Sequence, residues 1–126
     1  MNATDRPIRV GVVGLGYWGP NLARNFAAIE GSELVWLCDQ SDPARTRVAH
    51  NFPQARLSAD IDELLEDAEL DAVVLATPVA THSQLASRVL EAGKHCFVEK
   101  PLATNVADAE RTVDAAQRAR RILMVG

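Results

Sequence analysis

Three glycines and one aspartate are spaced as a dinucleotide-binding site requires. Gly14, Gly16 and Gly19 form the pattern Gly-x-Gly-x-x-Gly at the end of the apolar run 8–14, and a helical pattern follows directly. Asp39 comes twenty residues after the third glycine, at the end of the next β-like run. In such a motif the first glycine permits a tight turn, the second leaves room for a pyrophosphate, and the third lets the helix approach the strand. The spacing therefore predicts a site for NAD or NADP.

Asp39 also bears on which of the two cofactors is bound. A carboxylate at the end of the second strand can accept hydrogen bonds from both hydroxyls of the adenosine ribose, and its charge repels a 2′-phosphate. We therefore expect NAD, with NADP the less favoured cofactor. Arg45, six residues later, could weaken this preference. The alternative is a plain strand-to-helix turn, with Asp39 only the first residue of a loop.

Two further groups of polar residues come at the ends of expected strands. Thr77 and Pro78 close the run 71–77, where a proline stops the strand. Thr81 could cap the next helix, and His82 lies in the first turn of that helix. A positive charge is disfavoured at a helix N-terminus, so we expect His82 to be a neutral, hydrogen-bonding imidazole.

The second group is Glu99, Lys100 and Pro101, which follow the run 95–99. Parallel α/β sheets bind their ligands at the carboxyl ends of the strands. A lysine there could place its ammonium beside a substrate hydroxyl and transfer a proton. The alternative is an exposed lysine at the start of an ordinary loop.

A regular alternation of strands and helices has to position these residues. Continuous apolar runs, typical of strands covered on both faces, occur at 8–14, 33–38, 71–77, 95–99 and 122–125. A shorter run at 55–58 could supply one more strand. Amphipathic helical patterns lie between them. This order predicts an α/β fold with a doubly wound parallel sheet, the Rossmann fold, with strand order 3-2-1-4-5-6 and helices on both faces. The ligand crevice is expected at the carboxyl ends of the first and fourth strands.

Several helix ends and one helix face can also be predicted. Asp60 and Glu63 have the spacing of a capping box, and Gly93 stands where a helix C-terminal cap belongs. The last helix shows an apolar stripe that is expected to face the sheet, formed by Val106, Ala109, Val113 and Ala116.

Composition excludes other classes of function. The net charge of −4 offers no basic face for nucleic acid, and no apolar run is long enough to span a bilayer. Residues 1–6 are polar and unlike a signal peptide, so we expect a cytoplasmic protein. Cys38 and Cys96 lie in expected strands and are interpreted as core thiols. No histidine or cysteine spacing indicates a metal site.

Taken together, these motifs resemble the Gfo/Idh/MocA oxidoreductase family. The motifs that carry the resemblance are the glycine turn 14–19, Cys38-Asp39, Ala76-Thr77-Pro78 with His82, and Gly93-Lys94-His95 running into Glu99-Lys100-Pro101-Leu102-Ala103. The resemblance implies an NAD(P)-dependent dehydrogenase. Such an enzyme moves a hydride between nicotinamide and a carbinol carbon of a sugar or nucleotide sugar.

The resemblance also implies a role for each site residue. The residues expected to hold the pyrophosphate and the adenosine ribose are Gly14, Gly16, Gly19, the backbone of Tyr17 and Trp18, and Asp39. The residues expected around the nicotinamide half of the cofactor are Thr77, Pro78, His82, Glu99, Lys100 and Pro101. Lys100 is the implied catalytic lysine, and the bond before Pro101 is expected to be cis.

The 126 residues are expected to form one dinucleotide-binding domain, 1–126, that ends directly after the apolar run 122–125. The resemblance implies a following α+β substrate domain, which we expect this chain to lack. We therefore expect a chain that binds NAD(H) but is inactive alone. The alternative is a non-catalytic NAD(H)-binding sensor or regulatory module. The exposed edge of the last strand also predicts self-association.

Overall fold

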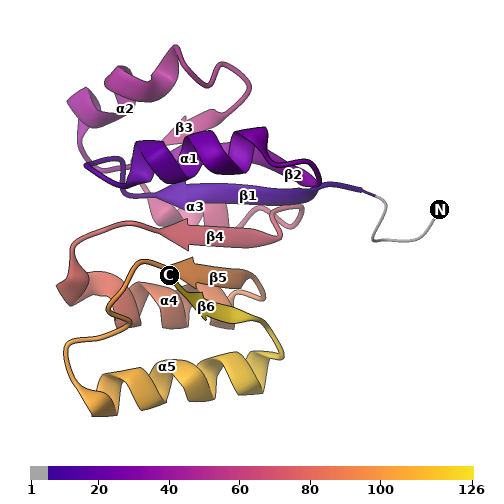
Figure 1. Cartoon of the computed structure of the whole chain (residues 1–126). Helices are drawn as coiled ribbons and strands as arrows, with labels where there is room; N and C mark the ends of the chain where they lie inside the picture. The colour runs from indigo at the N-terminus through magenta and orange to yellow at the C-terminus, as the bar shows by residue number, and fades with distance from the viewer. Residues whose placement is uncertain (1–5) are drawn as a thin grey trace.

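Strands and helices alternate along residues 6–126, the part of the chain that the computed structural model describes (Figure 1). The strands are β1 (Ile8–Val13), β2 (Ser32–Cys38), β3 (Arg56–Ser58), β4 (Ala72–Leu75), β5 (His95–Val98) and β6 (Leu123–Val125). The helices are α1 (Gly19–Ala28), α2 (Asp42–Ala49), α3 (Ile61–Leu65), α4 (His82–Glu91) and α5 (Val106–Ala119), with a 3₁₀ turn η2 (Val79–Thr81) before α4. Every expected strand is present, and its ends differ from the prediction by at most two residues.

All strand pairs are parallel, and their order is β3-β2-β1-β4-β5-β6. In Figure 1 the strands follow one another in this order down the picture. The register pairs Val13 at the end of β1 with Cys38 of β2 and with Leu75 of β4. The carboxyl ends of these three strands are therefore level. The segments that follow them leave the sheet at one common edge, as the predicted Rossmann topology requires.

Both faces of the sheet are covered by helices. On one face, Leu64 of α3, Val89 of α4 and Ala115 of α5 belong to one apolar cluster. On the other face, Ala23 of α1 and Val48 of α2 belong to a second cluster. Burial of one large aliphatic side chain contributes roughly 1.5–3 kcal/mol, so strands buried on both sides hold the layers firmly in place. The continuous apolar strands are explained by this double covering.

Helix α4 ends as the sequence predicts, but the Thr81 side chain does not cap its start. Ala86, Val89 and Leu90 are buried, and Gly93 has a φ of +86° just beyond the helix end. A residue with a Cβ adopts this left-handed conformation only at a cost, so glycine suits the C-terminal cap. The cap that starts α3 is only partly as expected. The Asp60 carboxylate accepts from the Asp62 N–H at 2.9 Å, but Glu63 accepts from the Ser58 hydroxyl and does not complete a capping box.

The predicted apolar stripe of α5 is correct for Ala116 but wrong for its two valines. Val106 and Val113 are 72% and 42% exposed, whereas Thr112, Ala115 and Ala116 are buried. The reason is that α5 packs closely against α4, as the hydrogen bond between the hydroxyls of Ser87 and Thr112 shows. Small side chains permit this approach, whereas valines would hold the two helices apart. Within residues 6–126, no helix is long and apolar enough to cross a membrane.

Candidate functional site

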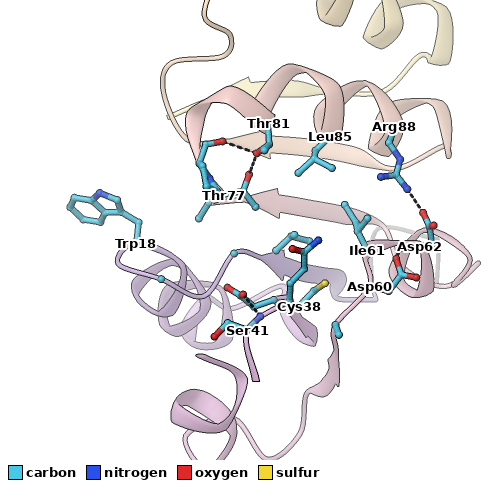
Figure 2. A pocket seen from close by; sticks show the side chains of 18 of the residues that line it. Trp18, Cys38, Ser41, Asp60, Ile61, Asp62, Thr77, Thr81, Leu85 and Arg88 are labelled. Atoms are coloured by element: carbon cyan, nitrogen blue, oxygen red, sulfur yellow. Dashed lines mark hydrogen bonds and ion pairs between the residues drawn. The ribbon is translucent and has the colours of Figure 1, made fainter. Parts of the chain in front are cut away.

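A cleft of about 810 Å³ lies at the carboxyl edge of the sheet. Its walls are the turn after β1, the segments that follow β2, β3 and β4, and one side of α4. The predicted site residues that line it are Gly14, Gly16, Tyr17, Trp18, Asp39, Thr77 and Pro78. Figure 2 shows Thr77 and Thr81 on one side of the cleft and Cys38 and Ser41 on the other. Residues as far apart in the sequence as Val13 and Arg88 thus meet in one groove, as the strand order predicts.

Each of the three positions in the turn requires glycine for a different structural reason. Gly14 has a φ of +96°, and a Cβ there would lie 2.6 Å from the carbonyl of Ala76. A Cβ on Gly19 would lie 1.7 Å from the carbonyl oxygen of Gly14, so this glycine allows α1 to begin directly beside the turn. A Cβ on Gly16 would meet no protein atom within 4 Å. The space above Gly16 is therefore open to a ligand.

The turn presents free hydrogen-bond donors to that space. Within residues 6–126, the amides of 16–18 donate to no protein acceptor. They precede the N-terminus of α1, where the helix dipole adds a partial positive charge. Pro20 lies in the first turn of α1, where its missing N–H costs nothing. This donor set fits an anionic pyrophosphate group. The rings of Tyr17 and Trp18 stack edge to face, with their centroids 4.9 Å apart, and both remain exposed.

Asp39 is held in place by two backbone amides. One carboxylate oxygen accepts from Leu15 N–H at 2.7 Å and the other from Ser41 N–H at 2.8 Å. A carboxylate has about four acceptor positions, so two remain for a ligand. Arg45 donates to the Asp39 carbonyl at 2.6 Å and to the Asp42 carboxylate at 2.8 Å. Asp39 therefore joins the glycine turn to the end of β2. Arg45 contacts the backbone carbonyl of Asp39 and not its carboxylate.

His82 is buried and does not line the cleft. It is 2% exposed, with Nε2 2.7 Å from the carbonyl oxygen of Thr77 and Nδ1 2.8 Å from that of Pro101. A carbonyl oxygen only accepts hydrogen bonds, so each ring nitrogen bonds its carbonyl only when that nitrogen carries a proton. The ring thus connects the loop after β4 to the loop after β5. Gly19 likewise lies outside the cleft, at the contact between α1 and the turn.

The Glu-Lys-Pro segment lies beside the cleft, at the end of β5. Its backbone is anchored, because Glu99 N–H donates to the Leu75 carbonyl at 3.0 Å and Lys100 N–H to that of Gly126 at 2.9 Å. The Lys100–Pro101 peptide bond is cis. Lys100 and Pro101 are exposed, and none of the three residues borders the cleft itself. Lys100 therefore lies at the carboxyl edge of the sheet, with its side chain open to solvent.

Several cleft residues were not predicted from the sequence. They are Gln40, Ser41, Ala59, Asp60, Ile61, Asp62, Thr81, Leu85 and Arg88. Arg88 of α4 forms an ion pair with Asp62 of α3 and closes one end of the cleft (Figure 2). The position of Asp60 directly after a strand was the available signal, because strand ends in this fold face the ligand.

Both cysteines are buried and free, as predicted. Burial, together with the smaller effect of the nearby Asp39 charge, raises the pKa of the Cys38 thiol to about 12. Burial also raises the pKa of the Cys96 thiol to about 12. Only the thiolate is a strong nucleophile, so neither residue provides reactive sulfur at neutral pH. Cys38 contributes to the cleft wall as a small apolar group.

Comparison with known proteins places this site in context. A family model described as "Oxidoreductase family, NAD-binding Rossmann fold" matches residues 8–126. The inositol 2-dehydrogenase of Acidothermus cellulolyticus is 39% identical over 98% of this chain, which spans only 37% of the length of that protein. The crystal structure of GenD2 from gentamicin A biosynthesis, in complex with NAD, has a TM-score of 0.92 and 34% identity, covering 99% of this chain and 36% of that one. Biliverdin reductase from Synechocystis, solved with biliverdin and NADP+, has a TM-score of 0.89 and 33% identity, covering 94% of this chain and 37% of that one.

Proposed function

We propose that this chain, which belongs to the Gfo/Idh/MocA oxidoreductase family with its NAD-binding Rossmann fold, is the cofactor-binding part of a dehydrogenase. The proposed substrate of that dehydrogenase is a sugar or nucleotide sugar. The observation that carries this proposal is the cleft, in which the unpaired amides of 16–18 and the carboxylate of Asp39 lie at one edge of the sheet. The similarity to an inositol dehydrogenase supports a ring carbinol as the group that reacts.

The dinucleotide would lie across the carboxyl ends of β2, β1 and β4. The amides of 16–18 would bind the pyrophosphate, and the two free acceptor positions of Asp39 would bind the hydroxyls of the adenosine ribose. Arg45 would give little help to a 2′-phosphate, because its guanidinium is engaged by Asp39 and Asp42. We therefore propose that NAD is preferred over NADP.

Lys100 is the residue proposed to move the substrate proton. NAD, when bound, supplies the hydride acceptor of the reaction. The ε-amino group would take the proton of the carbinol hydroxyl as the hydride leaves the carbon, and would return it in the reverse direction. Two features support this assignment. Lys100 follows β5, the strand beside β4, and its amide is anchored to Gly126.

The polypeptide of residues 1–126 is proposed to bind NAD(H) and to turn over little by itself. Its Lys100 side chain is exposed to solvent. A catalytic group that is not enclosed with its substrate loses most of the rate advantage that comes from fixed orientation. Steady-state reduction of NAD by this polypeptide with a panel of inositols and hexoses would contradict this part of the proposal. The cytoplasmic location stays a prediction.

The enzymatic role can be tested in a chimera. The chain is joined at residue 126 to the remaining carboxyl-terminal part of the Acidothermus enzyme, and NADH formation is measured with inositols and sugars. We expect Lys100→Ala to lower kcat by about 10²–10⁴-fold while the affinity for NADH, measured by fluorescence titration, stays the same. If the Lys100→Ala chimera kept full activity, Lys100 would have no part in the chemistry. A folded chimera that binds NADH but oxidises none of these substrates would favour the sensor alternative.

A further inference from the structure

Two threonine hydroxyls and one carbonyl form an ordered chain beside the cleft. The Oγ1 atoms of Thr77 and Thr81 are 2.7 Å apart, and Thr81 Oγ1 is 2.6 Å from the carbonyl oxygen of Pro78. Figure 2 shows both hydroxyls on the α4 side of the cleft. A carbonyl oxygen has no proton to give, so a contact of 2.6 Å requires that Thr81 be the donor. A hydroxyl has one proton, and the proton of Thr77 must therefore point to Thr81.

The hydroxyl of Thr81 has no other structural task. Thr81 occupies the N-cap position of α4, but its side chain accepts no hydrogen bond from the helix, unlike the caps Ser41 and Asn105 of α2 and α5. The Pro78 carbonyl is already satisfied by the Thr81 N–H at 2.9 Å. Neither the helix nor the turn thus depends on this hydroxyl. Its consequence for the cleft is that Thr77 has no proton left to donate there.

We propose that Thr81 is a positioning residue that makes Thr77 Oγ1 a pure hydrogen-bond acceptor toward the bound dinucleotide. Only the lone pairs of Thr77 then face a ligand in the cleft that Thr77 lines. The ligand group that fits is a donor: a hydroxyl of the nicotinamide ribose, or the carboxamide N–H of the nicotinamide. This inference rests on the proposed binding of NAD(H), and adds to it the direction of one hydrogen bond and the residue that sets that direction.

The position of Thr77 in the sheet favours the nicotinamide half. Asp39 follows β2 and Thr77 lies just beyond β4, on opposite sides of β1 and its glycine turn. A dinucleotide whose pyrophosphate lies at the glycine turn and whose adenosine ribose is held by Asp39 extends its other nucleoside toward β4. Thr77 would therefore contact the nicotinamide riboside and not the adenosine.

The test compares four forms of the polypeptide by calorimetric titration: the unchanged chain, Thr81→Val, Thr81→Ser and Thr46→Val. Valine keeps the shape of threonine and removes the hydroxyl, serine restores the hydroxyl, and Thr46 is an exposed control on α2. In Thr81→Val the Thr77 proton is free and can turn toward the ligand donor. We expect NADH to bind about two- to tenfold more weakly to Thr81→Val, the range of one hydrogen bond, and normally to the serine and control variants.

Two further ligands identify the group that Thr77 contacts. AMP, which lacks the nicotinamide half, should bind equally to all four forms. The reduced 3-acetylpyridine analogue of NADH has no carboxamide N–H. If the carboxamide is the donor, Thr81→Val should not weaken this analogue, and if the ribose is the donor it should weaken the analogue and NADH alike. Circular dichroism melting of each variant verifies that it is folded.

Three results would overturn the inference. Unchanged NADH affinity in folded Thr81→Val would show that the hydroxyl chain has no effect on the ligand. A loss of AMP affinity as large as that of NADH would assign Thr77 to the adenosine half. No binding of NADH to the unchanged chain would refute the proposed function itself, and the inference with it.

Discussion

At the scale of single residues, substitutions at Gly16 and Gly19 should affect different properties: ligand binding at Gly16 and folding stability at Gly19. A Cβ on Gly19 would overlap the Gly14 carbonyl, whereas a Cβ on Gly16 meets no protein atom. We expect Gly19→Ala to lower the free energy of unfolding by about 1–3 kcal/mol or more, since the helix must move away from the turn. Gly16→Val should leave stability within about 0.5 kcal/mol, yet weaken NADH binding at least about tenfold by occupying the pyrophosphate space. Urea unfolding and calorimetric titration measure the two effects.

The pair of variants forms its own control. Normal NADH affinity in Gly16→Val would show that the pyrophosphate does not lie at this turn. A Gly19→Ala variant as stable as the unchanged chain would show that α1 can move without cost.

Some residues of the site could be predicted from the sequence, and others could not. The glycines and Asp39 could be found because their spacing is tied to one strand-turn-helix unit. The contact of Arg88 with Asp62 joins two helices far apart in the sequence, and no local pattern indicates it. The hydroxyl chain from Thr77 to Pro78 depends on the rotamer of one threonine, which periodicity does not determine.

At the scale of elements, the end of α5 carries backbone strain. Arg120 closes the helix with a φ of +55°, a conformation that costs a residue with a Cβ about 1–2 kcal/mol. We expect Arg120→Gly to raise the free energy of unfolding by about 1 kcal/mol, measured by urea denaturation. Arg118→Gly, an exposed site inside the last helical turn, should lower it by about 1 kcal/mol. Equal destabilisation by both changes would mean that the left-handed cap contributes no strain.

The attachment of β6 is expected to depend on pH through His95. Burial lowers the pKa of His95 below its usual value, and the charge of Arg121 lowers it further. The neutral Nδ1 accepts a hydrogen bond from Ile122 N–H at 2.9 Å, and a proton on this nitrogen would remove that bond. The unfolded chain binds a proton at a higher pH, near 6.5, than the folded chain. The stabilisation is therefore complete above about pH 6.5 and is lost as the pH falls toward the lowered pKa.

Urea unfolding at a series of pH values measures this dependence. We expect stability to decline as the pH falls below about 6.5, with faster amide hydrogen exchange in β6, and the decline to be smaller in His95→Gln. His50, which is exposed on the surface, provides the matched control His50→Gln, and its profile should follow that of the unchanged chain. The same slope in His95→Gln and the unchanged chain would contradict the assignment.

Most helices and strands could be predicted from the sequence, and the error in the buried face of α5 has a physical cause. Strand positions and order followed from the apolar runs, because strands buried on both faces need apolar residues throughout. The buried face of α5 was wrong because close helix packing selects Thr112 and Ala115 over the larger Val113. Periodicity finds the hydrophobic side of a helix, but the partner helix decides which residues fit.

At the scale of the whole molecule, β6 exposes an unpaired edge. It is the outer strand next to β5, and Ile122, Met124 and Val125 are 66%, 57% and 44% exposed. Such edges pair with other chains, so we expect the polypeptide to self-associate with rising concentration in sedimentation velocity. Met124→Lys should reduce the association, whereas Val106→Lys, which removes an exposed valine on α5, should not. A monomer at all concentrations would contradict this prediction.

The central claim is that this fold presents a preformed site that prefers NAD. The most direct measurement is a calorimetric titration of the polypeptide with NADH and, separately, with NADPH. We expect saturable binding of NADH and at least about tenfold weaker binding of NADPH, because the 2′-phosphate would approach the Asp39 carboxylate. Equal or tighter binding of NADPH, or binding of neither cofactor, would contradict it.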